Sequence, residues 1–226
     1  MKKILLILCC FSLQLYPYSQ EEVAALKETV VLARKGAFGW CSTEKISSFI
    51  DLVLEVEPEI CVEIGVYGGA SILPVAYALK FLRNGIIVAI DPWDFVECVR
   101  HIDPVKDPQA WKTWLGVDMD VVHAEFLSLL HKNGLEDVCL PVRSTSEKAA
   151  NEVLENIDIL HIDGDHSEYG SLRDVELYLP KVRPGGYIWL TDAIWQERNQ
   201  AVDYLLERCV FVKWIDNCST FLFRKK

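Results

Sequence analysis

The chain has 226 residues, of which 51% are hydrophobic, and carries a formal net charge of −10 at pH 7. This length and composition suffice for one sizeable core and leave little room for a second domain. The acidic excess argues against a nucleic-acid partner, because clusters of lysine and arginine bind phosphates.

Residues 1–19 resemble a secretory signal peptide. Met1-Lys2-Lys3 precede an apolar run over Ile4–Leu15, which is short for a membrane span. The region after the run lacks a clear small-residue cleavage pattern. Export, an uncleaved anchor at the membrane surface and a misassigned start codon remain open alternatives. The folded domain is expected over residues 20–226.

After Gln20, helix-like and strand-like segments alternate. Helices are predicted over Glu21–Lys35, from a cap at Ser42 or Thr43, and over Ser71–Phe81, Met119–Lys132, Ser146–Glu155, Glu168–Leu179 and Gln196–Arg208. Strands are predicted over Glu59–Ile64, Ile86–Ile90, Val138–Val142, Asp158–Ile162, Tyr187–Thr191, Val210–Ile215 and Thr220–Phe223. Such alternation predicts an α/β fold in which helices cover both faces of a parallel sheet.

The last two predicted strands break the parallel pattern. Only Asp216-Asn217-Cys218-Ser219 connect them, and a parallel crossover needs a dozen or more residues. A seven-stranded, mostly parallel sheet with one reversed C-terminal strand is therefore expected. Pro141 places the strand Val138–Val142 at the sheet edge, because proline has no N–H to donate to a neighbouring strand and is tolerated mainly in edge strands.

Residues 94–116 fit neither the helix nor the strand pattern. This insertion follows a strand and contains Trp111, Trp114, several prolines and a lone His101. Ligands bind open α/β sheets at the C-terminal ends of the strands, so the insertion is a candidate substrate lid. The alternative is an ordinary loop whose tryptophans pack on the core.

The stretch VEIGVYGGAS, residues 62–71, looks like a phosphate-binding glycine loop with Glu63 at the position of the first glycine. A carboxylate repels a pyrophosphate and favours a cationic ligand. S-adenosylmethionine carries an ammonium and a sulfonium and has no phosphate. Gly65, Gly68 and Gly69 permit the backbone to approach its nucleoside closely.

Asp91 stands at the end of the next strand, where an acidic residue binds the ribose hydroxyls in Rossmann-type sites. A turn-forming Asp-Pro pair is the structural alternative. Together with the glycine loop, Asp91 predicts a nucleoside site.

Four motifs carry a resemblance to a known family: Glu63–Ser71, Ile90–Trp93, Leu160–Ser167 and Leu179–Gly186. In this order they resemble class I S-adenosylmethionine-dependent methyltransferases, which have a Rossmann-like sheet. The closest resemblance is to the small-molecule O-methyltransferase-like subgroup whose fourth strand ends in Asp-Gly-Asp-His. The likeness covers about residues 59–192.

The resemblance implies roles for individual residues. Glu63 and Gly65 would face the methionine end of the cofactor, Asp91 the ribose, and Ser144 and Thr145 the adenine, although Arg143-Ser144-Thr145 departs from the Gly-Asp pair usual there. The predicted cofactor-binding set is Glu63, Gly65, Gly68, Gly69, Ser71, Asp91, Ser144, Thr145 and Asp163.

The predicted catalytic residues are Asp163 and His166, and Asp163 and Asp192 are the predicted metal ligands. Related enzymes hold a divalent ion with acids at these two strand ends, and an all-oxygen site suits Mg²⁺. Ala193 follows Asp192 where metal-dependent relatives commonly have another amide or acid, so metal dependence stays open. His166 is a candidate base for a hydroxyl proton, and capping of the following helix is its structural alternative. His161 is expected to be a core residue.

The leading functional hypothesis is S-adenosylmethionine-dependent methylation of a small-molecule hydroxyl group. The same fold also serves propylamine transferases and NAD-dependent enzymes, although Glu63 argues against NAD. An exported binding module without catalysis is the alternative if residues 1–19 direct export, and those residues would otherwise associate with a membrane. The cofactor chemistry favours the cytoplasmic side.

Overall fold

A computed structural model describes residues 18–153, 155–217 and 219–226. Apart from Tyr18 and Ser19, the segment predicted to be a signal peptide or anchor lies outside these residues. None of the helices in the described part of the chain is both long and apolar enough to span a membrane.

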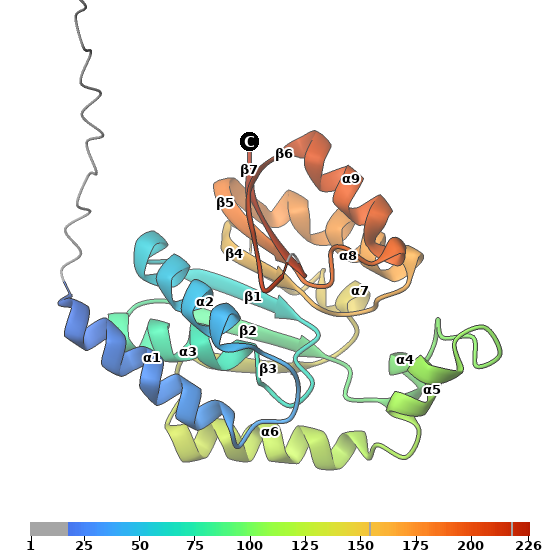
Figure 1. Ribbon diagram of the computed structural model, residues 1–226, viewed down its shortest axis with the longest axis horizontal. Coiled ribbons are helices and arrows are strands. Elements are labelled where there is room, and N and C mark those ends of the chain that lie inside the picture. The colour runs from blue at the N-terminus through green and yellow to red at the C-terminus, as the bar shows by residue number, and fades with distance from the viewer. Residues whose placement is uncertain (1–17, 154, 218) are drawn as a thin grey trace, which may run out of the picture.

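Seven strands form one sheet in the order β3-β2-β1-β4-β5-β7-β6 (Figure 1). The strands are β1 (Ile60–Ile64), β2 (Ile86–Asp91), β3 (Cys139–Arg143), β4 (Ile157–Ile162), β5 (Val182–Leu190), β6 (Cys209–Ile215) and β7 (Thr220–Lys225). Strands β1 to β5 pair in parallel, and β7 pairs antiparallel with both β5 and β6. The predicted sheet with a reversed C-terminal strand is confirmed.

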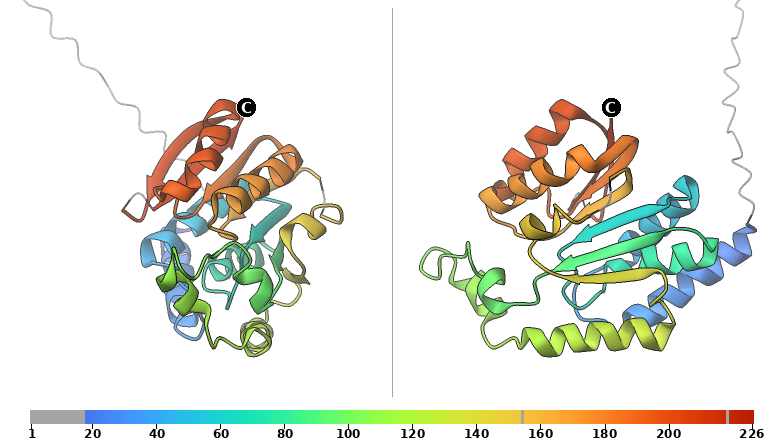
Figure 2. Two further views of the ribbon diagram at one scale, coloured as in Figure 1. Left: turned by 90° about the vertical axis from the view of Figure 1, so that its right-hand side faces the viewer. Right: turned by 180° about the vertical axis from the view of Figure 1, so that it is seen from behind.

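Helices cover both faces of the sheet, as the views in Figure 2 show. One face packs against α1 (Gln20–Arg34), α2 (Thr43–Val56), α3 (Ile72–Leu82) and α6 (Met119–Asn133). The other face packs against α7 (Ser146–Ala149), α8 (Glu168–Tyr178) and α9 (Asn199–Arg208). The short 3₁₀ helix η1 (Leu179–Lys181) follows α8, and a second one, η2 (Gln196–Arg198), precedes α9. Alternate residues of the central strands enter the two cores, so the sheet is buried on both sides.

Serine residues fix the starts of the helices beside the site. The Ser42 hydroxyl accepts a hydrogen bond from the Lys45 N–H at 3.1 Å and begins α2. Ser167 does the same for α8 by accepting from the Gly170 N–H at 3.0 Å. Such caps satisfy N–H groups that have no partner inside the helix. Because Ser167 caps α8, the alternative interpretation of His166 as the cap of this helix is wrong.

The sequence interpretation was wrong about the helix over Ser146–Glu155. The helix α7 ends at Ala149 after one turn, and the chain then turns into β4 through Asn156, whose φ is 64°. The chain bends there because β4 begins at the next residue and asparagine tolerates the left-handed conformation.

The second difference concerns β5, which begins at Val182 rather than Tyr187. Ile157 pairs with Val182 and Ile159 with Tyr187, so the predicted turn residues 183–186 bulge out between the two pairs. The turn residues are therefore an irregularity within the strand rather than its boundary.

The strand β3 lies at the sheet edge, as Pro141 predicted, with Pro141 beside Ala89 of β2. At the C-terminal ends of the parallel strands the insertion extends away from the sheet (Figure 1). It contains two short helices, α4 (Phe95–Cys98) and α5 (Pro108–Trp114).

Candidate functional site

The glycine loop between β1 and α3 is held tightly against other parts of the chain. Gly65 and Gly69 have φ angles of 84° and 89°, a region that glycine adopts without strain. A β-carbon on Gly65 would overlap the backbone of Asp163, and one on Gly69 would lie 2.7 Å from the Phe126 ring. One face of each glycine therefore makes room for protein rather than for a ligand. Contact between the loop and a nucleoside stays a prediction.

Glu63 lies beneath this loop and has no solvent-exposed surface. Its Oε1 accepts a hydrogen bond from the Ser71 hydroxyl at 2.5 Å, and its Oε2 lies 3.4 Å from Nδ1 of His161. The sequence placed this carboxylate at the mouth of the loop, whereas the structure places it inside. Its charge therefore acts on a ligand through a medium of low dielectric constant, where charges are screened less than in water.

His161 continues the buried polar row from β4 to β5. It is 3% exposed, its Nε2 lies 2.9 Å from the Thr191 hydroxyl, and the edge of its ring packs against Phe49. His161 is thus the core residue that the sequence predicted. Ser71, Glu63, His161 and Thr191 form a continuous buried polar row across three strands and α3.

Asp91 binds the backbone of the glycine loop. Its carboxylate accepts hydrogen bonds from the Tyr67 N–H at 2.9 Å and the Trp93 N–H at 2.7 Å. Burial raises the pKa of Asp91, and these two hydrogen bonds oppose the increase. The Asp-Pro turn and a ligand role are compatible here, since each carboxylate oxygen has lone pairs beyond the one used.

Ser144 and Thr145 line a depression of about 310 Å³ at the ends of β2 and β3, together with Pro92, Asp94 and Lys148. The Ser144 N–H donates to the Asp91 carbonyl at 3.0 Å, and the Thr145 hydroxyl caps α7. Pro92, the residue after Asp91, also lines this depression, and contact of Ser144 and Thr145 with the adenine stays a prediction.

Asp163, His166 and Asp192 converge at the ends of β4 and β5. One ligand atom of each residue lies within 4.8 Å of those of the other two. The Nε2 atom of His166 is 3.0 Å from Asp192 Oδ2 and 3.7 Å from Asp163 Oδ1. The sequence predicted all three residues for the reacting centre, and the structure brings them together.

The two carboxyl groups of this cluster differ in their electrostatics. Burial raises the pKa of Asp163. Burial also opposes ionisation of Asp192, but the hydrogen bond and charge of His166, with the charges of Lys45 and Arg198, lower its pKa overall. Asp192 has a φ of 51°, an uncommon angle for a non-glycine residue that indicates a constrained position.

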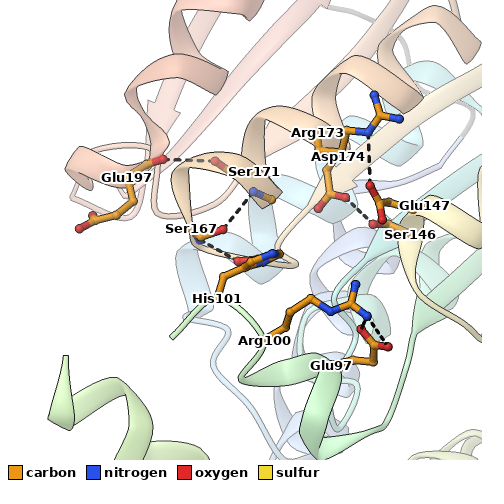
Figure 3. A network of polar contacts seen from close by, with 12 residues as sticks. Glu97, Arg100, His101, Ser146, Glu147, Ser167, Ser171, Arg173, Asp174 and Glu197 are labelled. Carbon is orange, nitrogen blue, oxygen red and sulfur yellow. Dashed lines mark hydrogen bonds and ion pairs between the residues drawn. The ribbon is translucent and has the colours of Figure 1, made fainter. Parts of the chain in front are cut away.

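The insertion contacts Asp165, which lies between Asp163 and His166 in the chain, through a residue that sequence reasoning left without a role. His101 Nδ1 forms a short hydrogen bond with Asp165, whose other oxygen accepts from the Ser167 N–H at 2.8 Å. Figure 3 shows His101 reaching the loop in front of Ser167. The two partners are 64 positions apart in the sequence, and no local pattern indicates the pair.

Two buried cations near the cluster were also missed. Arg198 has no exposed surface, and its Nη1 donates to the Asp165 carbonyl at 3.2 Å. Lys45 is 7% exposed, and its charge opposes the rise in the pKa of Asp163 and helps to lower the pKa of Asp192. Buried lysine and arginine are rare unless they face acids, but this signal appears only after the chain is folded.

The profile of a family described as "Methyltransferase domain" matches residues 62–193, more than half of the chain. The chain belongs to this family. Glu63, Asp91, Asp163 and Asp192 all lie within the matched segment. The helices α1 and α2 and the β6–β7 hairpin, which flank the methyltransferase domain match, lie outside it.

Solved structures share the fold of this methyltransferase domain. A methyltransferase from Podospora anserina, PaMTH1, solved with bound SAH, superposes with a TM-score of 0.65 at 16% identity, covering 93% of this chain and 97% of the other. An O-methyltransferase from Bacillus cereus in complex with SAH gives 0.59 at 16% identity and 94% of each chain. The O-methyltransferase TomG from Streptomyces achromogenes, in complex with SAM, gives 0.63 at 13% identity, covering 95% and 93%. No curated protein sequence matches this methyltransferase domain.

Proposed function

We propose that the chain transfers a methyl group from S-adenosylmethionine to a hydroxyl group of a small molecule. The observation that carries this proposal is a row of acidic side chains at or beside the C-terminal ends of four parallel strands: Glu63, Asp91, Asp163 and Asp192. Such a row disfavours phosphate ligands and favours a cationic nucleoside. The SAH- and SAM-bound structures with this fold support the choice.

We further propose that the methyl acceptor is a hydroxyl group and that the chain belongs to the Asp-Gly-Asp-His subgroup. His166 is one-third exposed, with its Nε2 beside Asp192. We assign the Nε2 proton to this contact, which leaves the Nδ1 lone pair to accept the hydroxyl proton. S-adenosylmethionine supplies an electrophilic methyl group, and the chain supplies position and a base.

Asp163 and Asp192 also fit a divalent cation. They offer two carboxylate oxygens in the same small cluster as His166, and Mg²⁺ is commonly held by one or two carboxylates together with water. A bound cation would lower the pKa of the acceptor hydroxyl. We propose that the insertion over residues 94–116 closes above this cluster as a lid, held by His101.

Isothermal titration calorimetry tests the first step. S-adenosylmethionine should bind the folded full-length chain with micromolar affinity, and NADH should not bind. Absence of binding at millimolar S-adenosylmethionine, or binding of NADH instead, would contradict the proposal. Titration of Mg²⁺ into the wild type and into Asp192→Asn then tests the cation site, since only the wild type should bind it.

A further inference from the structure

A cationic hollow lies beside the site, outside the matched methyltransferase segment. It measures about 500 Å³ and is formed by the end of α1, the start of α2 and the turn between β6 and β7. Its lining contains the cationic residues Arg34, Lys35 and Lys45, and the acid Asp216. In a chain with a net charge of −10, a hollow with an excess of positive charge needs a physical reason.

The cations of this hollow have hydrogen-bonding capacity to spare. The acid nearest to Lys45 is Asp216, at 3.8 Å between Nζ and Oδ2, which is too long for a hydrogen bond. Arg34 donates from Nη2 to the Gly39 carbonyl at 3.3 Å, while its buried Nε has no partner within the described part of the chain. A buried arginine donor without a partner is costly, and the Lys45 ammonium can still donate hydrogen bonds to an anion.

The start of α2 adds to the positive potential. Ser42 and Thr43 line the hollow, and Thr43 is the first residue of this 14-residue helix. The N-terminus of a helix carries a partial positive charge and attracts anions. Three side-chain cations and a helix N-terminus therefore face one space.

The hollow is coupled to the reacting cluster through Lys45, which lines it. The charge of Lys45 opposes the rise in the pKa of Asp163 and helps to lower the pKa of Asp192. Cys41 lines it as well, and burial, reinforced by the charges of Glu63 and Asp163, raises the pKa of its thiol to about 12. The thiol is therefore an uncharged part of the lining near neutral pH and not a nucleophile.

An exposed aromatic ring forms one wall of the hollow. Trp40 is 69% exposed and stacks on Tyr67 of the glycine loop, with ring centres 6.0 Å apart and planes 14° apart. A flat ligand body can pack against this indole while an attached acid reaches the cations.

We propose that this hollow binds a carboxylate carried by the methyl acceptor, so that the acceptor is a hydroxylated acid with a flat body. The identification of the ligand as the methyl acceptor rests on the proposed function, whereas the anion site rests on the geometry of the hollow alone. The amino-acid carboxylate of the cofactor is a second source of the same chemistry, and the test separates the two.

The test is calorimetric titration of the full-length protein with two pairs of probes. The first pair is 3,4-dihydroxybenzoate and the neutral 3,4-dihydroxybenzamide. The second pair is S-adenosylhomocysteine and 5′-methylthioadenosine, which lacks the carboxylate. The variants are Arg34→Gln and Lys35→Gln, and the control is Lys132→Gln, an exposed lysine in the last turn of α6. Thermal melting checks that Arg34→Gln still folds.

The acid should bind the wild type about tenfold more tightly than the amide, and each hollow variant should weaken the acid about five- to tenfold. The affinities for the amide and for both nucleosides should not change in the hollow variants. The control variant Lys132→Gln should bind every probe as tightly as the wild type does. Equal affinities for acid and amide, no binding of the acid at millimolar concentration, or unchanged binding in both hollow variants would overturn the inference. Weaker binding of S-adenosylhomocysteine by the hollow variants, with unchanged binding of 5′-methylthioadenosine, would also overturn the inference. That result would assign the hollow to the carboxylate of the cofactor. If no nucleoside binds but the acid preference depends on Lys35, the proposed function fails and the anion site stands.

Discussion

Gly65 presses against the carbonyl group of Asp163, so that a β-carbon at position 65 would overlap that oxygen. This contact joins the loop after β1 to the loop after β4, and hence the predicted cofactor side of the site to its reacting side. The two loops can approach so closely only because position 65 has no side chain.

Replacing Gly65 by alanine should therefore destabilise the fold more than the backbone angle alone explains. Gly116 is a matched control, because it has nearly the same φ, 85°, and nothing within 4 Å of an added β-carbon. We expect Gly116→Ala to lower the free energy of unfolding by about 1 kcal/mol and Gly65→Ala by several kcal/mol, on the order of other buried clashes. Urea denaturation measures both, and equal losses would contradict the close contact.

Glu63→Gln keeps the shape of the buried side chain and removes its charge. The affinity for S-adenosylmethionine should fall about tenfold, whereas the affinity for uncharged adenosine should stay unchanged. Glu59→Gln is the control, since Glu59 is exposed just before β1. A parallel loss for both ligands in calorimetry would mean that Glu63 supports the loop and does not select charge.

His166→Ala should lower the rate of methyl transfer about 10²- to 10⁴-fold, the usual contribution of a general base. Affinity for S-adenosylmethionine should stay within about twofold, because His166 contacts the acids at the reacting end and packs on Trp195. Single-turnover kinetics with a radiolabelled methyl group measures the rate. A rate for the variant within about twofold of the wild type near neutral pH would contradict the base role.

His101→Ala removes the contact between the insertion and Asp165. We expect a higher KM for the acceptor and faster cleavage within residues 94–116 by limited proteolysis. His131→Ala is the control, because His131 also pairs with a carboxylate, Glu136, at an exposed site on α6. If both variants digest at the wild-type rate, His101 does not hold the insertion.

Asp174 should make stability depend on pH. Burial raises its pKa to about 7, against a hydrogen bond from Ser146 that favours ionisation (Figure 3). The folded state thus holds a proton that the unfolded state releases near pH 4. This contribution to stability is complete below about pH 4 and disappears as the pH rises through about 7.

Asp174→Asn should remove that dependence. Above pH 7 the free energy of unfolding of the variant should exceed that of the wild type by an amount on the order of a few kcal/mol. The difference should shrink towards pH 4. Denaturation curves at several pH values measure it. A difference that grows towards low pH would have the wrong sign for a buried acid.

The sequence was sufficient for most of the fold because its signals are local or topological. The four-residue connection after Ile215 allows only an antiparallel pair, and Pro141 suits only an edge strand, so both predictions were confirmed. The predicted continuation of the helix beyond Ala149 was wrong, because the chain must reach β4 within a few residues. The local sequence pattern does not indicate that constraint.

The candidate site was predictable where residues stand at strand ends. Parallel strands bring their C-terminal ends to one edge, which is why Asp163, His166 and Asp192 could be grouped from sequence. The position of Glu63 beneath the loop and the contact of His101 with Asp165 depend on tertiary packing. Lys45 and Arg198 had no predicted role, because their burial depends on the tertiary fold.

The acidic row at the strand ends also determines when the site can form during folding. Its members come from β1, β2, β4 and β5, which are far apart in the chain and meet only in the completed sheet. A partly folded chain would therefore hold no assembled site, and a bound ligand would stabilise only the final native state. Ligand binding and completion of the sheet should consequently appear as one cooperative event.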